Sequence, residues 1–322
     1  MTAADLAAIR AGGKPAVARA LAAIETRGGL ARLAPLLDCC LEETRGQAIG
    51  LTGPPGVGKS TLTDALVRIY RGRGESVGVV AVDPSSRLTG GALLGDRTRV
   101  RTDPEDAGVF VRSMAARDRL GGLSDAAAAA VALMGAVYDK VLVESVGIGQ
   151  SEADVATVAD TVVLCIQPGS GDSVQFMKAG VMEIPDVVAV TKADTGAPAR
   201  RAAADVLGAL SLGVRLTSGW TTAVLAVSAT TGEGLDALAA ALDDHVRFGC
   251  DPAIRAVRRR AMVAEAVRAA FGGVGLAQVD PGVAIEAAGG PFSALATIGA
   301  DLERRLRAAP AQAVAADDQG RS

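Results

Sequence analysis

The chain has 322 residues, of which 49% are hydrophobic and 21% charged, and its net charge is −3. This composition is typical of a globular protein, and the length allows one substantial core with added elements. A slightly acidic balance with 2% aromatic residues argues against nucleic acid as a partner. No apolar run reaches the length of a bilayer and no secretory signal stands at the N-terminus, so we expect a cytoplasmic protein that makes no membrane contact.

The cysteines and the single histidine give no sign of a dedicated metal site. Cys39, Cys40, Cys165 and Cys250 show no CxxC spacing, and His245 stands near the end of a stretch with helical periodicity. We therefore expect reduced thiols, no soft-metal centre, and a structural role for His245.

The first 45 residues predict a helical extension that precedes the sheet. Gly12 and Gly13 break a first short helix, and Pro15 suits the first turn of a second helix that runs to about Thr26. A third helix is predicted over residues 30–43, because apolar side chains recur there at helical spacing.

A phosphate-binding loop is the most informative segment of the chain. Residues 53–60 read Gly-Pro-Pro-Gly-Val-Gly-Lys-Ser, follow an apolar run at 48–51 and open a helical stretch. Backbone N–H groups of such a loop wrap a polyphosphate, Lys59 reaches the terminal phosphates and the Ser60 hydroxyl binds Mg²⁺. The predicted nucleotide contacts here are Gly53, Pro54, Pro55, Gly56, Val57, Gly58, Lys59, Ser60 and Thr61.

Two further strands end in acidic residues that could reach the metal ion. The apolar run 77–82 leads to Asp83, and the run 140–143 leads to Glu144, three residues before Gly147. The polar segment 89–101 between them carries Asp96 and is predicted to respond to the nucleotide. We expect Ser60, Asp83, Asp96 and Glu144 in the Mg²⁺ shell and the Gly147 N–H on the γ-phosphate.

A guanine-binding segment is predicted after the strand at 187–190. Thr191, Lys192 and Asp194 follow that strand, and the Asp194 carboxylate can accept hydrogen bonds from the N1–H and the amine of guanine, which adenine cannot offer. The strand at 224–227 brings Ser228 and Ala229, whose N–H groups could meet the guanine carbonyl.

A helix predicted over residues 235–245 closes the sheet. Two more helices are predicted after it, over residues 252–271 and 293–308, and the tail after Pro310 is expected to be disordered. The apolar faces of these two helices must be buried against another surface. We expect a second subunit, rather than the chain's own nucleotide-binding domain, to provide that surface. The sequence thus predicts a doubly wound, mostly parallel α/β sheet of the P-loop NTPase type at 46–250. It also predicts an N-terminal helical extension at 1–45 and a C-terminal dimerisation arm at 251–322.

The chain resembles the MeaB/ArgK branch of the SIMIBI-class GTPases over almost its whole length. The most specific strings are Ala-Val-Asp-Pro-Ser-Ser at 81–86, the run 89–99, and Glu-Ser-Val-Gly-Ile-Gly-Gln-Ser-Glu at 144–152. The resemblance implies a homodimeric GTPase, using GTP/GDP and Mg²⁺, that acts as a chaperone of an adenosylcobalamin-dependent acyl-CoA mutase of the methylmalonyl-CoA mutase type. It would gate cofactor delivery and protect or reactivate the mutase. Thr191 replaces the family's usual asparagine, which should weaken affinity while Asp194 preserves base choice.

The expected catalytic residues are Lys59, Asp96, Glu144 and Gln150. The apolar Ile148 follows Gly147 where Ras-type enzymes carry a water-orienting glutamine, so we expect slow hydrolysis that a partner accelerates; Gln150 or one of Arg97, Arg99 and Arg101 could complete the site. Three alternatives remain: a metal-insertion GTPase, which the scattered cysteines and single histidine disfavour; a transport-associated ArgK-like ATPase or kinase; and a structural dimer that binds nucleotide without turnover.

Overall fold

The computed structural model describes residues 3–83, 103, 105–115, 125–145, 151–169, 185–212, 219–249 and 252–308. Within them, seven strands form one sheet in the order β3-β2-β4-β1-β5-β6-β7, and every neighbouring pair is parallel. The strands are β1 (Gln47–Thr52), β2 (Val77–Asp83), β3 (Val109–Ala115), β4 (Lys140–Glu144), β5 (Thr161–Ile166), β6 (Val187–Val190) and β7 (Ala223–Ala226). The predicted doubly wound α/β class is confirmed.

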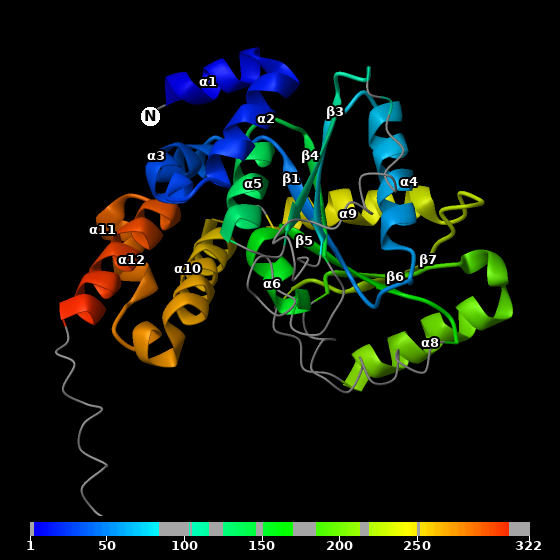
Figure 1. Cartoon of the computed structure of the whole chain (residues 1–322). Coiled ribbons are helices and arrows are strands. Elements are labelled where there is room, and N and C mark those ends of the chain that lie inside the picture. The colour runs from blue at the N-terminus through cyan, green and yellow to red at the C-terminus, as the bar shows by residue number, and fades with distance from the viewer. Residues whose placement is uncertain are drawn as a thin grey trace, which may run out of the picture.

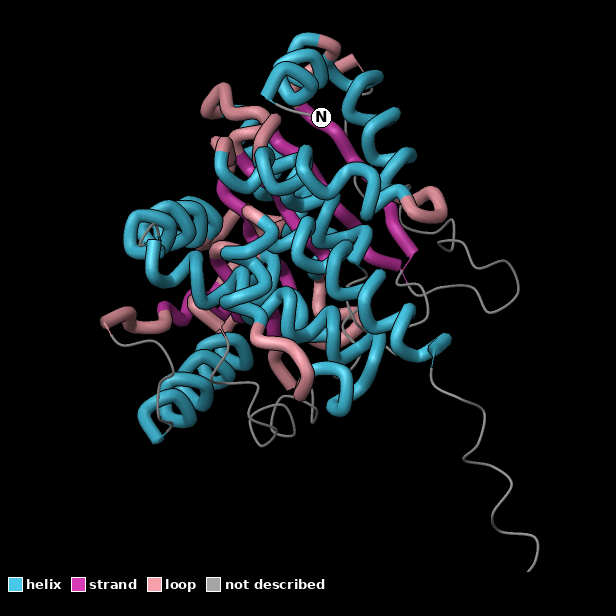
Figure 2. The backbone as a smooth tube through the Cα atoms, turned by 90° about the vertical axis from the view of Figure 1, so that its left-hand side faces the viewer, coloured by secondary structure: helices cyan, strands magenta, loops and turns pink. Residues whose placement is uncertain are grey.

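Helices cover both faces of this sheet (Figures 1 and 2). They are α1 (Ala3–Ala11), α2 (Gly13–Ile24), α3 (Gly29–Glu42), α4 (Lys59–Gly72), α5 (Asp125–Gly135), α6 (Ser151–Val158), α8 (Ala197–Leu212), α9 (Leu235–Gly249), α10 (Pro252–Leu276), α11 (Pro281–Ala288) and α12 (Pro291–Ala308). Helices α6, α8 and α11 were not predicted from the sequence. The sequence predicted that this helix ends at residue 271, but α10 is assigned to Leu276 and is broken at Gly272, which has φ 70° and ψ −174°.

The middle residues of the central strands are apolar because helices cover both of their faces, whereas the edge strands β3 and β7 are only half-buried along most of their length. Along β4, Val141 and Val143 pack into the cluster that contains α3 and α5, whereas Leu142 packs into the cluster that contains α4 and α9. Strand β1 lies at the centre of the sheet, and all six of its residues are buried. The phosphate loop therefore leaves the sheet from a fully buried central strand.

A chain of buried polar groups runs along the amino ends of the strands, at the edge opposite the phosphate loop. Lys140 Nζ donates to Gln47 Oε1 at 2.8 Å, and Gln47 Nε2 donates to Thr161 Oγ1 at 3.2 Å. Thr161 Oγ1 lies 2.9 Å from His245 Nδ1, and His245 Nε2 lies 3.1 Å from Asp186 Oδ1. His245 is 1% exposed and fastens α9 to the sheet, which confirms its predicted structural role.

The C-terminal arm, defined here as α10–α12, buries its apolar stripes within the same chain. Val263 and Val267 of α10 pack against Ala294, Ile298 and Leu302 of α12. Figure 1 shows α11 and α12 beside α3. The expectation that a second subunit buries these stripes is therefore wrong: the two helices cover each other, and α12 packs on the N-terminal extension α1–α3.

Asp38 joins the N-terminal extension to the arm. Its carboxylate accepts hydrogen bonds from the Phe292 N–H at 2.8 Å and the Ser293 N–H at 3.0 Å, in the first turn of α12. Those N–H groups have no partner inside their own helix, and a negative charge is favourable at that helix end. Gly290 makes room for the contact, because a Cβ there would lie 2.3 Å from Asp38 Cγ.

No single helix in the described ranges is long and apolar enough to cross a membrane. Helices α10 and α11, bent by 120° at their junction, pass that test together on length and composition only.

Replacing Asp38 by alanine should lower the free energy of unfolding by about 2–4 kcal/mol, because two buried N–H groups lose a charged acceptor. Urea unfolding followed by circular dichroism measures the change. Asp244→Ala, which removes an exposed ion pair with Arg247, is the matched control and should cost less than about 1 kcal/mol. Equal costs for the two variants would contradict the role of Asp38.

Candidate functional site

The phosphate loop connects β1 to α4 and has the backbone geometry of an anion cradle. Gly53, Gly56 and Gly58 have φ values of 132°, 75° and 101°, which side-chain-bearing residues rarely adopt. Gly53 is required on a second ground, since a Cβ there would lie 2.2 Å from the backbone oxygen of Cys165. The loop therefore lies directly against the end of β5, and α4 presents its N-terminus toward the loop.

Lys59 and Ser60 begin α4 and carry the polar groups of the loop. The Lys59 ammonium donates to the carbonyl oxygens of Gly53 at 2.8 Å and Pro54 at 3.0 Å, and the residue is only 6% exposed. These bonds fold the lysine back over the loop that it follows. Its charge lies over the phosphate loop, and its contact with the terminal phosphates of a nucleotide remains a prediction.

Ser60 and Glu144 meet across the gap between α4 and β4. The Ser60 hydroxyl donates to Glu144 Oε1 at 2.5 Å, and Glu144 is 7% exposed. The register explains the meeting, because Glu144 pairs with Leu51 of β1 and with Ala81 of β2. Two of the four predicted metal ligands are thereby in contact.

This pair fits a magnesium ion better than a softer metal. Mg²⁺ takes oxygen ligands and is usually held by one or two carboxylates together with phosphate oxygens and water. A hydroxyl and a carboxylate beside a phosphate loop provide such a donor set. Across the described ranges, no three His, Cys, Asp or Glu side chains converge on a common point for a metal ion.

The remaining predicted metal and catalytic residues are only partly placed. Asp83 is the last residue of β2, two positions beyond the residue that pairs with Glu144, so its backbone lies at the same edge of the sheet. Asp96, Gly147 and Gln150 lie outside the described residues. Their roles remain predictions.

Thr191 connects the guanine segment to the phosphate loop. Its hydroxyl oxygen lies 2.8 Å from the carbonyl oxygen of Val57 and 2.9 Å from that of Ile166, so these two acceptors share its single proton, and the residue is 6% exposed. Val57 is part of the loop, whereas Ile166 ends β5. Thr191 thus fixes the distance between the two segments that would hold opposite ends of a nucleotide.

Lys192 adopts a left-handed conformation, with φ 57° and ψ 43°, and so turns the chain after β6. Its ammonium donates to Gln167 Oε1 at 2.5 Å, directly beyond the end of β5. Asp194, two residues later, is exposed at the same edge of the sheet. An exposed carboxylate here is accessible to a base that enters from solvent.

The backbone around Ser228 is only partly suited to its predicted role. The Ser228 N–H donates to the Glu233 carbonyl at 2.9 Å, so it is engaged within its own turn. The Ala229 N–H is then the better candidate of the two for the guanine carbonyl. The hydrogen bond that closes the turn between Ser228 and Glu233 could not be predicted from the residue types.

Two residues of this site were not singled out from the sequence. Gln167 follows β5 immediately, and its position at the carboxyl edge of the sheet was the available signal. Cys165 is fully buried behind the loop, and burial raises the pKa of its thiol to about 12. The thiol is therefore protonated at neutral pH and serves as packing rather than as a nucleophile.

The comparisons with known proteins agree with this geometry. The family model described as "Methylmalonyl Co-A mutase-associated GTPase MeaB" matches residues 17–273. A Pyrococcus horikoshii protein named as a candidate GTPase is 43% identical over 240 residues, covering 72% of this chain and 74% of its own. The mitochondrial methylmalonic aciduria type A homolog of Mus musculus is 40% identical over 190 residues, covering 58% of this chain and 46% of its own.

Among solved structures, that of a protein named as a LAO/AO transport system kinase superposes with a TM-score of 0.67 at 25% identity. It covers 94% of this chain and 97% of its own. The parallel sheet and phosphate loop are therefore those of a P-loop NTPase, and the relatives are named as GTPases. The chain belongs to the MeaB family and is a P-loop GTPase that binds guanine nucleotides.

Proposed function

We propose that this GTPase serves as a chaperone of an adenosylcobalamin-dependent acyl-CoA mutase of the methylmalonyl-CoA mutase type. It would gate cofactor delivery and protect or reactivate the mutase, with bound GTP as the timing signal. The family description, which names methylmalonyl-CoA mutase, supports the client. The contact between Ser60 and Glu144 is the observation that best supports a response to bound nucleotide. It joins the first turn of the helix after the phosphate loop to the strand that leads into residues 145–150.

The proposed roles follow from position. Lys59 would neutralise the β- and γ-phosphates, and Ser60 and Glu144 would hold Mg²⁺ with Asp83 and Asp96 in its shell. Magnesium bound there would supply charge neutralisation of the transferred phosphoryl group. The Gly147 N–H would respond to the γ-phosphate, and Gln150 would help to orient the attacking water.

A homodimer is part of the proposal, although the arm's inner stripes are already covered. Among the described residues, the large apolar side chains that remain exposed are Leu207, Val257, Val274, Val283 and Leu306. All but Leu207 lie on the C-terminal arm. An arm with exposed apolar side chains is the surface that we expect a second copy to cover.

The second candidate is a transport-associated ATPase or kinase. It is favoured by the likeness to a solved structure whose protein is named as a transport system kinase. This alternative requires ATP preference and phosphate transfer to a protein. The exposed carboxylate of Asp194 argues for guanine, because adenine offers no pair of donors to it.

Thr191→Val should weaken GTP and GDP binding by about 5–100-fold, since the Val57 carbonyl loses its hydroxyl donor at a cost of about 1–3 kcal/mol, whereas the Ile166 carbonyl keeps the backbone N–H of residue 191. Fluorescence titration with a labelled guanine nucleotide measures the affinities. Thr191→Ser keeps the hydroxyl and is the control. Equal affinities for the two variants would show that the hydroxyl does not position the loop.

Asp194→Asn should reduce GTP affinity by about 100-fold or more, because two charge-assisted hydrogen bonds of about 1.5–3 kcal/mol each are lost. It should raise affinity for xanthosine triphosphate, whose 2-oxo group can accept from the asparagine amide. Competition titration with GTP, ATP and xanthosine triphosphate tests this, and Asp205→Asn on α8 is the control. Tighter binding of ATP than of GTP by the unaltered protein would favour the kinase alternative.

The client mutase should bind with an affinity that depends on the nucleotide, by roughly 5–150-fold between GDP and a non-hydrolysable GTP analogue. Methylmalonyl-, isobutyryl- and ethylmalonyl-CoA mutases are tested by co-purification, and phosphate release is measured with and without each. Intrinsic turnover should be low and should rise with one of them. Lys59→Ala, which should not bind GTP, is the control. Rapid hydrolysis unaffected by any mutase would contradict the proposal.

A further inference from the structure

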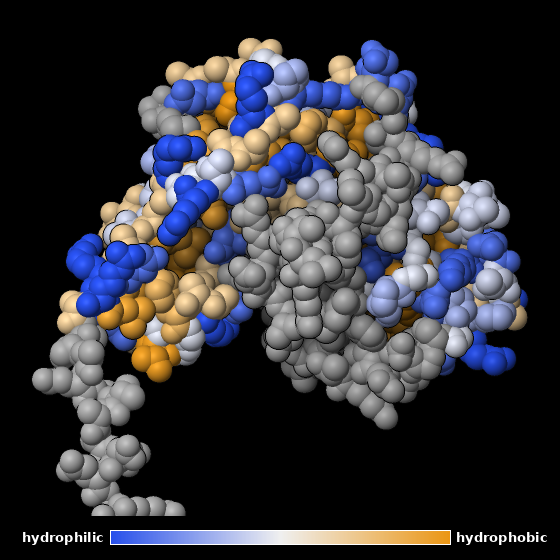
Figure 3. Space-filling model, viewed as in Figure 1, coloured by the Kyte–Doolittle hydropathy of each residue, from blue (hydrophilic) through white to orange (hydrophobic). Residues whose placement is uncertain are grey.

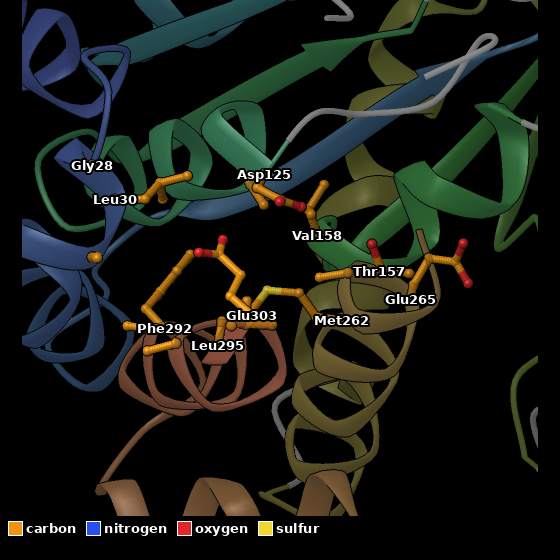
Figure 4. A pocket seen from close by; sticks show the side chains of 16 residues that line it. Gly28, Leu30, Asp125, Thr157, Val158, Met262, Glu265, Phe292, Leu295 and Glu303 are labelled. Atoms are coloured by element: carbon orange, nitrogen blue, oxygen red, sulfur yellow. The ribbon is translucent and has the colours of Figure 1, made fainter. Parts of the chain in front are cut away.

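A cavity of about 390 Å³ opens between the N-terminal extension and the C-terminal arm, away from the phosphate loop. Figure 3 shows an orange recess between α10 and α12, with blue side chains along its border. Figure 4 shows Leu30 of α3, Val158 of α6, Met262 of α10, and Phe292 and Leu295 of α12 around this space. We call this cavity and its continuation the arm groove.

The arm groove extends along α10. A second hollow of about 100 Å³ shares Ala128, Thr157, Val158, Met262 and Phe292 with the first, so the apolar floor is continuous. The far end is lined by arginines of α10 that already pair within the chain. Arg258 binds Asp160, and Arg259 binds Glu42. An elongated apolar floor flanked by helices fits a helix better than a compact ligand.

The near end of the arm groove is acidic. Asp125, Glu265 and Glu303 line it, and no lysine, arginine or histidine of the described residues does so. Glu265 pairs with Arg268 at 2.7 Å within α10, and Glu303 pairs with Arg307 at 3.6 Å within α12; Glu265 is half-buried, and the other three side chains are exposed. Such exposed pairs are worth about 0.3–0.5 kcal/mol, so a cation that approaches from outside can replace them.

The arm groove is also connected to the nucleotide site through α6. This helix begins directly after residues 145–150 and ends at Val158 in the groove wall. It lies tightly on β1, because a Cβ at Gly50 would come within 2.1 Å of Val155 Cγ1. A helix bound in the groove would thus touch an element that packs on the strand leading to the phosphate loop.

We propose that the arm groove binds an amphipathic helix of a partner protein, with an apolar face flanked by lysine or arginine. The apolar face covers Met262 and Phe292, and the basic residues meet Glu265 and Glu303. Charge complementarity selects this occupant over an acidic segment. The inference does not depend on the identity of the client mutase.

Gly299 of α12 offers a direct test, because it lines the groove and a Cβ there would meet nothing within 4 Å. The leucine of Gly299→Leu therefore leaves the helix into open space, and its side chain should occupy part of the groove while its helix propensity favours α12. The probe is a synthetic amphipathic peptide of about 16 leucine and lysine residues, long enough to be helical. The expected result is saturable binding to the full chain, weakened at least roughly tenfold by Gly299→Leu.

The matched control is Gly208→Leu on α8, where a Cβ also meets nothing within 4 Å but which lies outside the groove. It should leave peptide binding unchanged. Glu303→Lys should weaken the leucine–lysine peptide and favour a leucine–glutamate peptide, whereas Glu286→Lys on α11 should do neither. Isothermal titration calorimetry measures each affinity, and thermal unfolding checks that every variant is folded.

Equal peptide binding by wild type, Gly299→Leu and Gly208→Leu would overturn the proposal, as would preference for the leucine–glutamate peptide. Absence of peptide binding would do the same. The proposal would also be overturned if the wild-type chain were a dimer, Gly299→Leu were a monomer, and neither protein bound the peptide. That result would assign the groove to a second copy of the chain.

Discussion

The close approach of two backbones at the ends of β1 and β5 is the constraint on which the nucleotide site depends. Only glycine at position 53 allows it, because its φ of 132° and its contact with the Cys165 carbonyl exclude a side chain. The approach places the phosphate loop at the edge of the sheet where β4 delivers Glu144 and where Thr191 follows β6. Every described contact of the site, from Lys59 to Thr191, relies on that placement.

The fold was most predictable where a single local sequence pattern determines the structure of a segment. The parallel sheet followed from continuous apolar runs, and the loop followed from glycine spacing before a helix. The contact between Ser60 and Glu144 was anticipated only as a shared metal shell, since strand register brings the two residues together and spacing alone does not give it. Helices α6, α8 and α11 were missed because alanine-rich segments with weak periodicity carry little signal.

The C-terminal arm shows why the surface that buries an apolar helix face is hard to predict from a single sequence. Leu302 and Ile298 indicated a helix that needed cover, but periodicity does not say which surface provides it. The cover came from α10, and α12 also packs on α3, where the Asp38 carboxylate binds its first turn and Phe292 joins the apolar cluster of α3. A contact between residues 254 positions apart has no local pattern that would reveal it.

The link through Asp38 also bears on how the protein is made. Helix α3 leaves the ribosome long before Phe292 is synthesised, and at 5–20 residues per second the delay is roughly 13–50 s. Throughout that interval the Asp38 carboxylate and the apolar side chains around it lack their final cover. The nascent chain therefore exposes this apolar surface until α12 has been synthesised, so the docking of α12 on α3 is a late step in the folding of the described part of the chain.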